Sequence, residues 1–315
     1  MDKKIKIDII SGFLGAGETT LINKLLEEVY LGEKVAILEN EFGEIGIDNE
    51  LLAQHGLVVK EIVNGCICCS LQGDFIEGMK ELATNYSLDR IVVEPTGIGA
   101  IQDVLSACRL AIIHLNASIN AVITVVDATM LPVFLEVGGD YYEQQIIDSL
   151  VITMSFVQNL TDENEDIAAL KNSIRQLNPN ACIFAEPWDV LNSLQLLTVA
   201  EEITKKEEHN KEPQSHHEHI YEDEKDNFES CAFYLENVWF EESIRIFIKQ
   251  MNAGNFGRIY RSKGFFSNGE KCCKLDYVYG RATIIPVDYK GESKVVIVGK
   301  NLNCAAVQMF MMGDR

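Results

Sequence analysis

The sequence is poor in basic residues. It has 27 Lys and Arg against 48 Asp and Glu in 315 residues, which gives a formal net charge of −21. An acidic surface repels the phosphates of nucleic acids and of anionic lipids, so neither is expected as a partner. Cations, basic proteins and metal ions are favoured instead.

Long apolar runs and a signal-peptide core are also missing. No run approaches the length that crosses a bilayer, and the chain passes from Met1 almost directly into a predicted strand. We therefore expect a cytoplasmic protein that does not engage a membrane. The nine cysteines are odd in number and clustered, which is typical of a reduced compartment, so no structural disulfide is expected.

Length and pattern predict two domains. Apolar residues make up 47% of the chain, enough for a sizeable core. Strands are predicted at 5–10, 34–38, 57–62, 90–94, 120–126, 150–154 and 181–184, with helices at 21–29, 74–83 and 162–177. This alternation indicates an α/β domain over residues 1–197, with a mostly parallel sheet covered on both faces.

The composition changes after this domain. Residues 198–227 are dense in Glu, Asp and Lys and include four of the six histidines, His209, His216, His217 and His219. We interpret them as an acidic linker, which either collects divalent metals or is simply polar. Residues 228–315 predict a small α+β domain. Its adjacent Cys272 and Cys273 should lie on opposite faces of a strand and are interpreted as structural.

A glycine loop follows the first strand. Residues 12–20 read G-F-L-G-A-G-E-T-T, close to the phosphate-binding pattern G-x-x-x-x-G-K-[ST]. In that pattern, backbone N–H groups at a helix N-terminus bind phosphates, the lysine reaches the β- and γ-phosphates, and the hydroxyl binds Mg²⁺. Gly12, Gly17 and Thr19 keep their places. The alternative is a glycine-rich turn without a ligand.

Glu18 stands where the pattern has lysine. A pair of unit charges 4 Å apart is worth about 4 kcal/mol at an effective dielectric of about 20. Replacing this attraction by repulsion predicts weak nucleotide binding and slow hydrolysis.

Three thiols follow the strand predicted at 57–62. Cys66, Cys68 and Cys69 are typical ligands of a soft or borderline ion such as Zn²⁺, Cu⁺ or Co²⁺. Adjacent thiols rarely all reach one ion, so another segment is expected to contribute. Buried cysteines that act as small apolar residues are the alternative.

Acidic residues end two further strands. Glu41 and Asp48 are candidates for binding a metal or positioning a water, although a solvated acidic loop would look the same. Glu94 and Gly97, in the segment E-P-T-G, are placed where Mg²⁺ and a γ-phosphate would lie. A plain proline-containing turn is the alternative there.

Four motifs in this order carry a family resemblance: S-G-F-L-G-A-G-x-T-T, E-N-E-F-G-E-I-G-I-D, N-G-C-I-C-C and E-P-T-G-I. The chain resembles the CobW-like branch of the CobW/HypB/UreG family of P-loop GTPases. Residues 257–264 and 295–299 are similar to the C-terminal domain of that branch. The resemblance implies GTP-dependent delivery of a transition metal, usually zinc or cobalt, to a metalloprotein client. A homodimer is a possible assembly.

The resemblance also implies site residues. GTP or GDP with Mg²⁺ would be bound by Gly12, Gly15, Ala16, Gly17, Glu18, Thr19, Thr20, Gly97, Ser155 and Gln158. The catalytic candidates are Glu94 and Glu41, and the metal candidates are Cys66, Cys68, Cys69 and Glu41.

Two positions depart from the family pattern, and both face the nucleotide. One is Glu18, and the other is the base-recognition segment, which reads S-F-V-Q from Ser155 and lacks a basic residue. Phe156 would stack on a base without selecting guanine strongly. Three hypotheses follow: a slow metal-responsive GTPase, a nucleotide-deficient metal-binding module, and a regulatory partner of an active paralogue.

Overall fold

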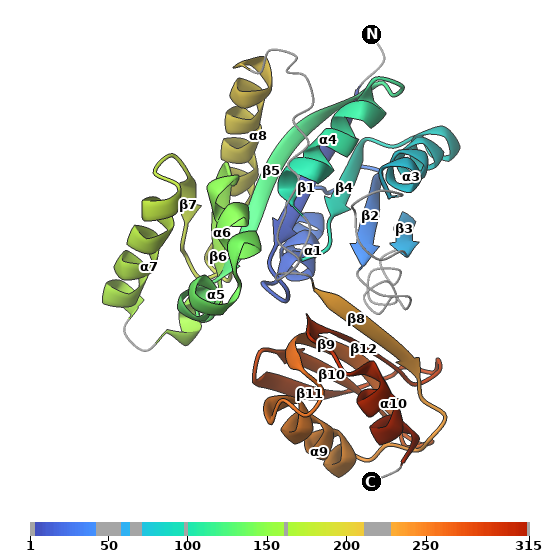
Figure 1. The fold of residues 1–315 in the computed structure, drawn as a ribbon. Coiled ribbons are helices and arrows are strands. Elements are labelled where there is room, and N and C mark those ends of the chain that lie inside the picture. The colour runs from blue at the N-terminus through green and yellow to red at the C-terminus, as the bar shows by residue number, and fades with distance from the viewer. Residues whose placement is uncertain are drawn as a thin grey trace. The chain divides into compact units, whose positions relative to one another are not determined.

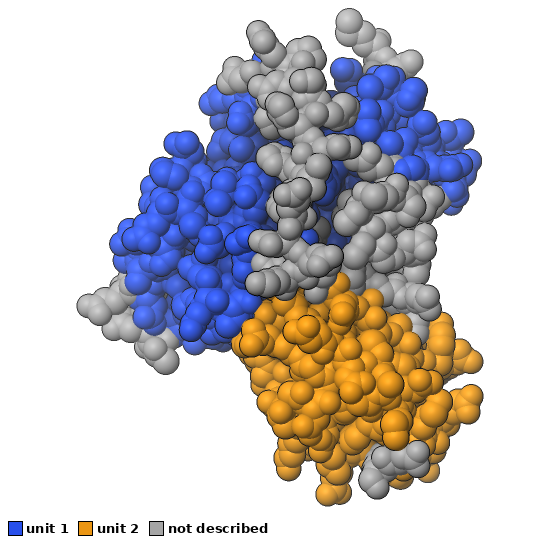
Figure 2. Space-filling view, in the orientation of Figure 1, with its two compact units in different colours: residues 1–41, 48–62, 66–222 blue, residues 42–47, 63–65, 223–315 orange. Residues whose placement is uncertain are grey.

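The structure is a computed structural model that describes residues 4–41, 58–63, 71–97, 100–160, 163–210 and 228–313. The chain divides into two compact units (Figure 2). Unit 1 consists of residues 1–41, 48–62 and 66–222, and unit 2 of residues 42–47, 63–65 and 223–315. Each unit is described by itself.

Unit 1 is built on a seven-stranded sheet in the order β3-β2-β4-β1-β5-β6-β7 (Figure 1). The strands are β1 (Ile5–Gly12), β2 (Val35–Glu41), β3 (Val58–Val63), β4 (Arg90–Glu94), β5 (Ala117–Asp127), β6 (Val151–Ser155) and β7 (Cys182–Phe184). The pairings from β2 through β4, β1, β5 and β6 to β7 are all parallel. The predicted α/β class is confirmed, and carboxyl ends of neighbouring strands share one edge.

Helices cover both faces of this sheet. They are α1 (Glu18–Glu28), α3 (Leu71–Asn85), α4 (Ile101–Ile112), α5 (Leu131–Val137), α6 (Asp140–Ile147), α7 (Glu163–Leu177) and α8 (Ser193–Asn210), with a short 3-10 helix η2 (Val157–Asn159). Within β1, Ile9 packs in the core shared with α3 and α4, whereas Ile10 packs in the core shared with α1 and α8. Consecutive strand residues point to opposite faces, so a nearly continuous apolar strand fills two cores.

Helix α8 corrects the predicted linker. It ends at Asn210, so residues 198–210 are helical and belong to unit 1. Lys6 Nζ lies 3.0 Å from Glu201 Oε1, and Arg109 pairs with Glu208 at 2.6 Å. The charge density that suggested a linker thus comes partly from side chains paired with the rest of unit 1. The remaining residues, 211–227, with His216, His217 and His219, lie outside the described part.

Unit 2 has a five-stranded antiparallel sheet in the order β11-β10-β9-β12-β8. Its elements are β8 (Glu229–Tyr234), α9 (Glu241–Asn252), β9 (Arg258–Ser267), β10 (Cys272–Val278), β11 (Arg281–Val287), β12 (Lys294–Lys300) and α10 (Cys304–Met312). Trp239, Phe247 and Phe266 lie in the core between sheet and helices. The predicted α+β class is confirmed. Strand β11 was not predicted; it is an edge strand whose residues are mostly exposed.

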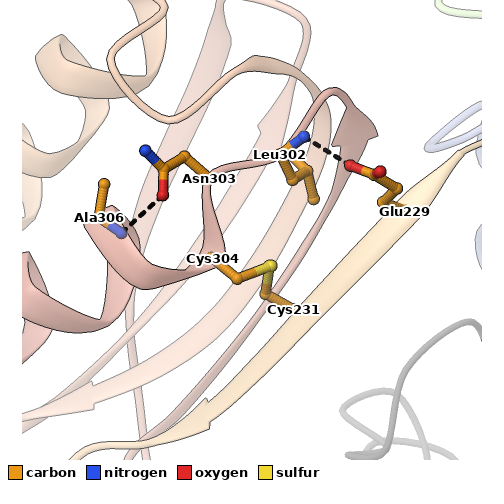
Figure 3. The surroundings of a disulfide bond; sticks show 6 residues. All are labelled: Glu229, Cys231, Leu302, Asn303, Cys304 and Ala306. Atoms are coloured by element: carbon orange, nitrogen blue, oxygen red, sulfur yellow. Dashed lines mark hydrogen bonds between the residues drawn. A yellow bond between two sulfur atoms is a disulfide. The ribbon is translucent and has the colours of Figure 1, made fainter.

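A disulfide in unit 2 contradicts the expectation that the chain has none. Cys231 in β8 bonds to Cys304, the first residue of α10, with Cα atoms 5.9 Å apart (Figure 3). Asn303 caps the helix beside it by accepting a hydrogen bond from the Ala306 N–H at 3.0 Å. The two cysteines are 73 residues apart, and only the tertiary fold brings them together.

Within the described residues, no helix has both the length and the apolarity needed to cross a membrane.

Candidate functional site

The glycine loop lies at the carboxyl end of β1 and leads into α1, between strands whose ends share the same edge of the sheet (Figure 1). Gly15 and Gly17 have φ angles of 76° and 113°, a left-handed conformation that glycine adopts without strain. The N–H of Ala16 donates to the carbonyl of Phe13 at 2.8 Å. Left-handed residues at these two positions turn successive backbone N–H groups toward one concave surface, which suits an anion.

Phe13 anchors the loop in unit 1. Its side chain is 2% exposed, and its ring packs edge-on against Phe134 and Tyr142 at centroid distances of 4.8 and 5.0 Å. Burial raises the pKa of Tyr142, and the nearby Asp127 raises it further, so this phenol stays protonated at neutral pH. Phe13 is therefore held among aromatic rings that carry no charge at neutral pH.

The side chain of Glu18 points back toward the glycine loop. It is the first residue of α1 and is 8% exposed, and its Oε2 accepts a hydrogen bond from the Gly17 N–H at 2.8 Å. A methyl group at Gly12 would lie 2.8 Å from both Cδ and Oε1 of Glu18. The carboxylate therefore lies inside the loop, against the backbone where the family pattern places a phosphate.

Thr19 joins the loop to the end of β4. Its hydroxyl donates a hydrogen bond to Glu94 Oε1 at 2.8 Å. Glu39 lies opposite Glu94 in the register of β2 and β4 and is 4% exposed. A hydroxyl and carboxylate oxygens are ligands that Mg²⁺ prefers. Sequence analysis named Glu41 and not Glu39. The place of Glu39 opposite Glu94 depends on β2 lying beside β4, which only the sheet order shows.

Gly97 lies against the loop. A methyl group at Gly97 would lie 2.8 Å from the backbone N of Leu14, so a larger residue has no room there. The Gln145 side-chain amide donates to the Gly97 carbonyl at 3.2 Å. The segment after β4 is thus held in contact with the glycine loop.

The end of β6 also contacts the glycine loop. The Ser155 hydroxyl donates to the carbonyl of Ala16 at 2.5 Å. Phe156 has a left-handed φ of 55°, and Gln158 is exposed on η2. Trp188, four residues after β7, is a residue that sequence reasoning missed. A methyl group at Gly17 would lie 3.3 Å from its indole ring.

The structure thus brings together most of the nucleotide candidates. They are Gly12, Gly15, Ala16, Gly17, Glu18, Thr19, Glu94, Gly97 and Ser155. Thr20 is exposed on α1, and Gln158 is exposed on η2. Their roles stay predictions.

The predicted metal site cannot be located in the same way. Cys66, Cys68, Cys69 and Asp48 lie outside the described residues, and Glu41 is described only as the last residue of β2. In the part that is described, no three His, Cys, Asp or Glu side chains are grouped so that they could hold a metal ion. Cys108 is a buried thiol, and burial raises its pKa to about 12, which makes it a poor ligand.

Comparison with known proteins identifies similar sequences. The family model described as "CobW/HypB/UreG, nucleotide-binding domain" matches residues 6–185. The zinc chaperone CobW of Pseudomonas aeruginosa is 38% identical over 135 residues, which cover 40% of this chain and 36% of that protein. The zinc chaperone YeiR of Escherichia coli is 32% identical over 160 residues, which cover 51% of this chain and 49% of that protein.

A longer match and a solved structure extend the comparison. Zinc-regulated GTPase metalloprotein activator 1 of Dictyostelium discoideum is 25% identical over 305 residues, covering 84% of this chain and 63% of that protein. For each of these three relatives, the match covers less than two thirds of the relative's own length. The Zn(II)-bound YjiA GTPase of E. coli aligns over 99% of both chains with 19% identity and a TM-score of 0.46.

Proposed function

Since the chain belongs to the CobW/HypB/UreG family, we propose that it is a metallochaperone that carries zinc or cobalt to a metalloprotein client and binds a guanine nucleotide weakly. Relatives named zinc chaperones and a zinc-regulated GTPase metalloprotein activator support zinc as the cargo. The acidic chain, with its net charge of −21, also favours cations over nucleic acids.

The cargo metal is held by Cys66, Cys68 and Cys69 together with Glu41. Thiolates and a carboxylate form a donor set that binds Zn²⁺ in a tetrahedral arrangement. Support for this set is the spacing of the thiols in the sequence and the position of Glu41 at the carboxyl end of β2. The same spacing suits Co²⁺, which accepts the same ligands.

The nucleotide proposal rests on one observation, the 2.8 Å hydrogen bond between Thr19 and Glu94 beside the glycine loop. These oxygen ligands fit Mg²⁺, which neutralises phosphate charge when it is bound. The N–H groups of the loop would bind phosphates, and Gly97, which lies against Leu14 of the loop, would sense a terminal phosphate. Glu18 does not fit a phosphate, so no catalytic step is assigned to the site.

Strand β2 offers a route between the two sites. Glu39 lies opposite Glu94 in the sheet, and Glu41 lies two residues further along the same strand. A change around Glu94 on nucleotide binding would thus reach the end of the strand that carries the proposed metal ligand. We infer that nucleotide and metal affinities are coupled, and coupling of this kind is reciprocal.

A zinc titration tests the metal site. The native chain and the variant Cys66→Ser/Cys68→Ser/Cys69→Ser are titrated against a chromophoric zinc chelator. The native chain should bind one zinc ion tightly, and the variant should lose that site. Cys182→Ser is the matched control, because Cys182 is a free, partly exposed cysteine elsewhere in unit 1. Equal zinc affinity in all three chains would rule out the thiol site.

Calorimetry tests the nucleotide site. GTP, GDP and ATP are titrated into the chain with Mg²⁺, with and without one equivalent of zinc. Weak binding of GTP and GDP that changes with zinc supports the proposal. Absence of binding by every nucleotide would leave only the metal function.

One observation favours a second candidate, a metal-binding module without a nucleotide cycle or a regulatory pseudo-GTPase. The Glu18 carboxylate accepts the hydrogen bond of a loop N–H that a phosphate would need. GTP turnover by the native chain and by Glu18→Lys separates the two functions. Background turnover in the native chain with activity in the variant favours the module, whereas turnover in the native chain excludes it.

A further inference from the structure

The glycine loop is occupied by a carboxylate from its own chain. Oε2 of Glu18 accepts the Gly17 N–H at 2.8 Å, and the side chain is 8% exposed. Its Cδ and Oε1 lie 2.8 Å from the position of a methyl group at Gly12, so the carboxylate fills the inner side of the turn. The acidic side chain thus points into the loop rather than into solvent.

The geometry of the loop explains why an anion lies there. Left-handed Gly15 and Gly17 shape the concave backbone, and the eleven-residue helix α1 begins at the next residue. Backbone N–H groups at a helix N-terminus carry partial positive charge and attract a carboxylate as they attract a phosphate. The Glu18 carboxylate therefore accepts the hydrogen bond of a loop N–H group, as a phosphate oxygen would.

We propose that Glu18 is an intramolecular anion that closes the phosphate site, so that a phosphate ligand enters only after its carboxylate has been displaced. The proposal rests on the proposed nucleotide function of the loop. It differs from simple loss of the lysine, because an absent lysine weakens binding whereas an occupying carboxylate also competes for the same N–H group.

Competition by a tethered group is strong. A group attached to the same chain acts at an effective concentration of about millimolar or above. Its negative charge also repels any phosphate that approaches the loop. Removing the carboxylate should therefore raise affinity for a phosphate ligand, even though no lysine is introduced. We expect an increase of about tenfold or more, the size of one charge-assisted hydrogen bond.

The competing explanation is that Glu18 only stabilises α1, as acidic residues in a first helical turn do. Both explanations predict a loss of stability on substitution, but only occupation of the loop predicts a gain in anion affinity. The control is Glu27→Ala, which removes the same charge from an exposed position of the same helix.

The experiment titrates inorganic pyrophosphate, and separately GDP, into the full chain and its variants with Mg²⁺ present. Glu18→Ala removes both the shape and the charge of the side chain, whereas Glu18→Gln removes only the charge. The expected order of affinity is Glu18→Ala above Glu18→Gln above native, with Glu27→Ala equal to native. Thermal unfolding gives a second readout, because pyrophosphate should raise the midpoint most in Glu18→Ala.

Two outcomes overturn the proposal. If native and Glu18→Ala bind GDP equally, the carboxylate does not close the site, while the nucleotide function stands. If no chain binds pyrophosphate or GDP, the loop is not an anion site and the nucleotide function fails with it. The zinc titration still tests the metal function independently.

Discussion

The Thr19 hydroxyl donates a hydrogen bond to the Glu94 carboxylate at 2.8 Å, joining the first turn of α1 to the end of β4. The two residues are 75 positions apart in the sequence. Their pairing places a hydroxyl and a carboxylate beside the glycine loop in unit 1. Because both groups offer oxygen to a divalent cation, this contact is where magnesium dependence should be tested first.

Thr19→Ala should weaken Mg²⁺-dependent binding of GDP by about tenfold or more, because one oxygen ligand is lost, whereas Thr19→Ser should retain binding. Calorimetry in Mg²⁺ and in EDTA measures GDP binding by both variants. The difference between Mg²⁺ and EDTA should shrink in Thr19→Ala. An unchanged magnesium effect in Thr19→Ala would remove Thr19 from the site.

Gly97→Ala should destabilise unit 1 by about 1–3 kcal/mol, because the added methyl group would lie 2.8 Å from the Leu14 backbone N. Gly73→Ala is the control, since nothing lies within 4 Å of a methyl group there and the residue is in α3. In a helix this control should raise stability by about 0.5–1 kcal/mol. Urea unfolding of both variants gives the comparison, and equal stabilities would contradict the close approach of Gly97.

Ser155→Ala should cost about 1 kcal/mol, because the Ala16 carbonyl would lose its 2.5 Å hydrogen bond. The matched control is Ser173→Ala, whose hydroxyl bonds to the Ala169 carbonyl in an exposed part of α7. That change should stay within about 0.5 kcal/mol. A larger loss from Ser173→Ala than from Ser155→Ala, measured in urea, would show that Ser155 does not support the loop.

Arg90→Ala should destabilise the chain by about 3–5 kcal/mol, since it leaves the buried Asp8 carboxylate without its cation. Arg90 also pairs with Glu33 at 2.7 Å and is itself 2% exposed. Arg109→Ala breaks a more exposed pair with Glu208 and should cost less than about 1 kcal/mol. Unfolding curves that rank Arg109→Ala as the more harmful variant would contradict the burial of the Asp8 pair.

Removing the disulfide with Cys231→Ser/Cys304→Ser should lower stability by about 4 kcal/mol, because a link between cysteines 73 residues apart restricts the unfolded chain. A reducing agent should destabilise the native chain by a similar amount and leave the variant unchanged. Unfolding is measured with and without dithiothreitol. If the reducing agent affects both chains equally, the bond does not form in solution.

The local patterns of the sequence were sufficient for most elements of unit 1. Strand β4 has the predicted ends, because its apolar run is bounded by a charged residue at each side. Strand β2 was predicted to end at residue 38 but continues to Glu41, since Glu39 is buried within it although glutamate is usually exposed. The strand and burial preferences of single residues do not predict a carboxylate that is buried because of its position in the sheet.

The same limit applies to long-range contacts. Residues 198–210 were predicted to belong to a linker because they are dense in charge. They form the end of α8 instead, and some of their charges have partners elsewhere in unit 1, as Glu201 has in Lys6. Likewise, Cys231 and Cys304 showed no pairing signal, since nothing local relates a strand to a helix 73 residues away.

The sequence by itself determined the family and the fold class, because the glycines and the threonine of the loop stand at the spacing of a phosphate-binding loop, directly after a strand and before a helix. It also determined that Glu18 replaces the lysine. Only the tertiary structure decided where that carboxylate lies. Its position depends on the left-handed turn at Gly17, whose N–H donates to the carboxylate, and on the absence of a side chain at Gly12, where a methyl group would lie 2.8 Å from Glu18.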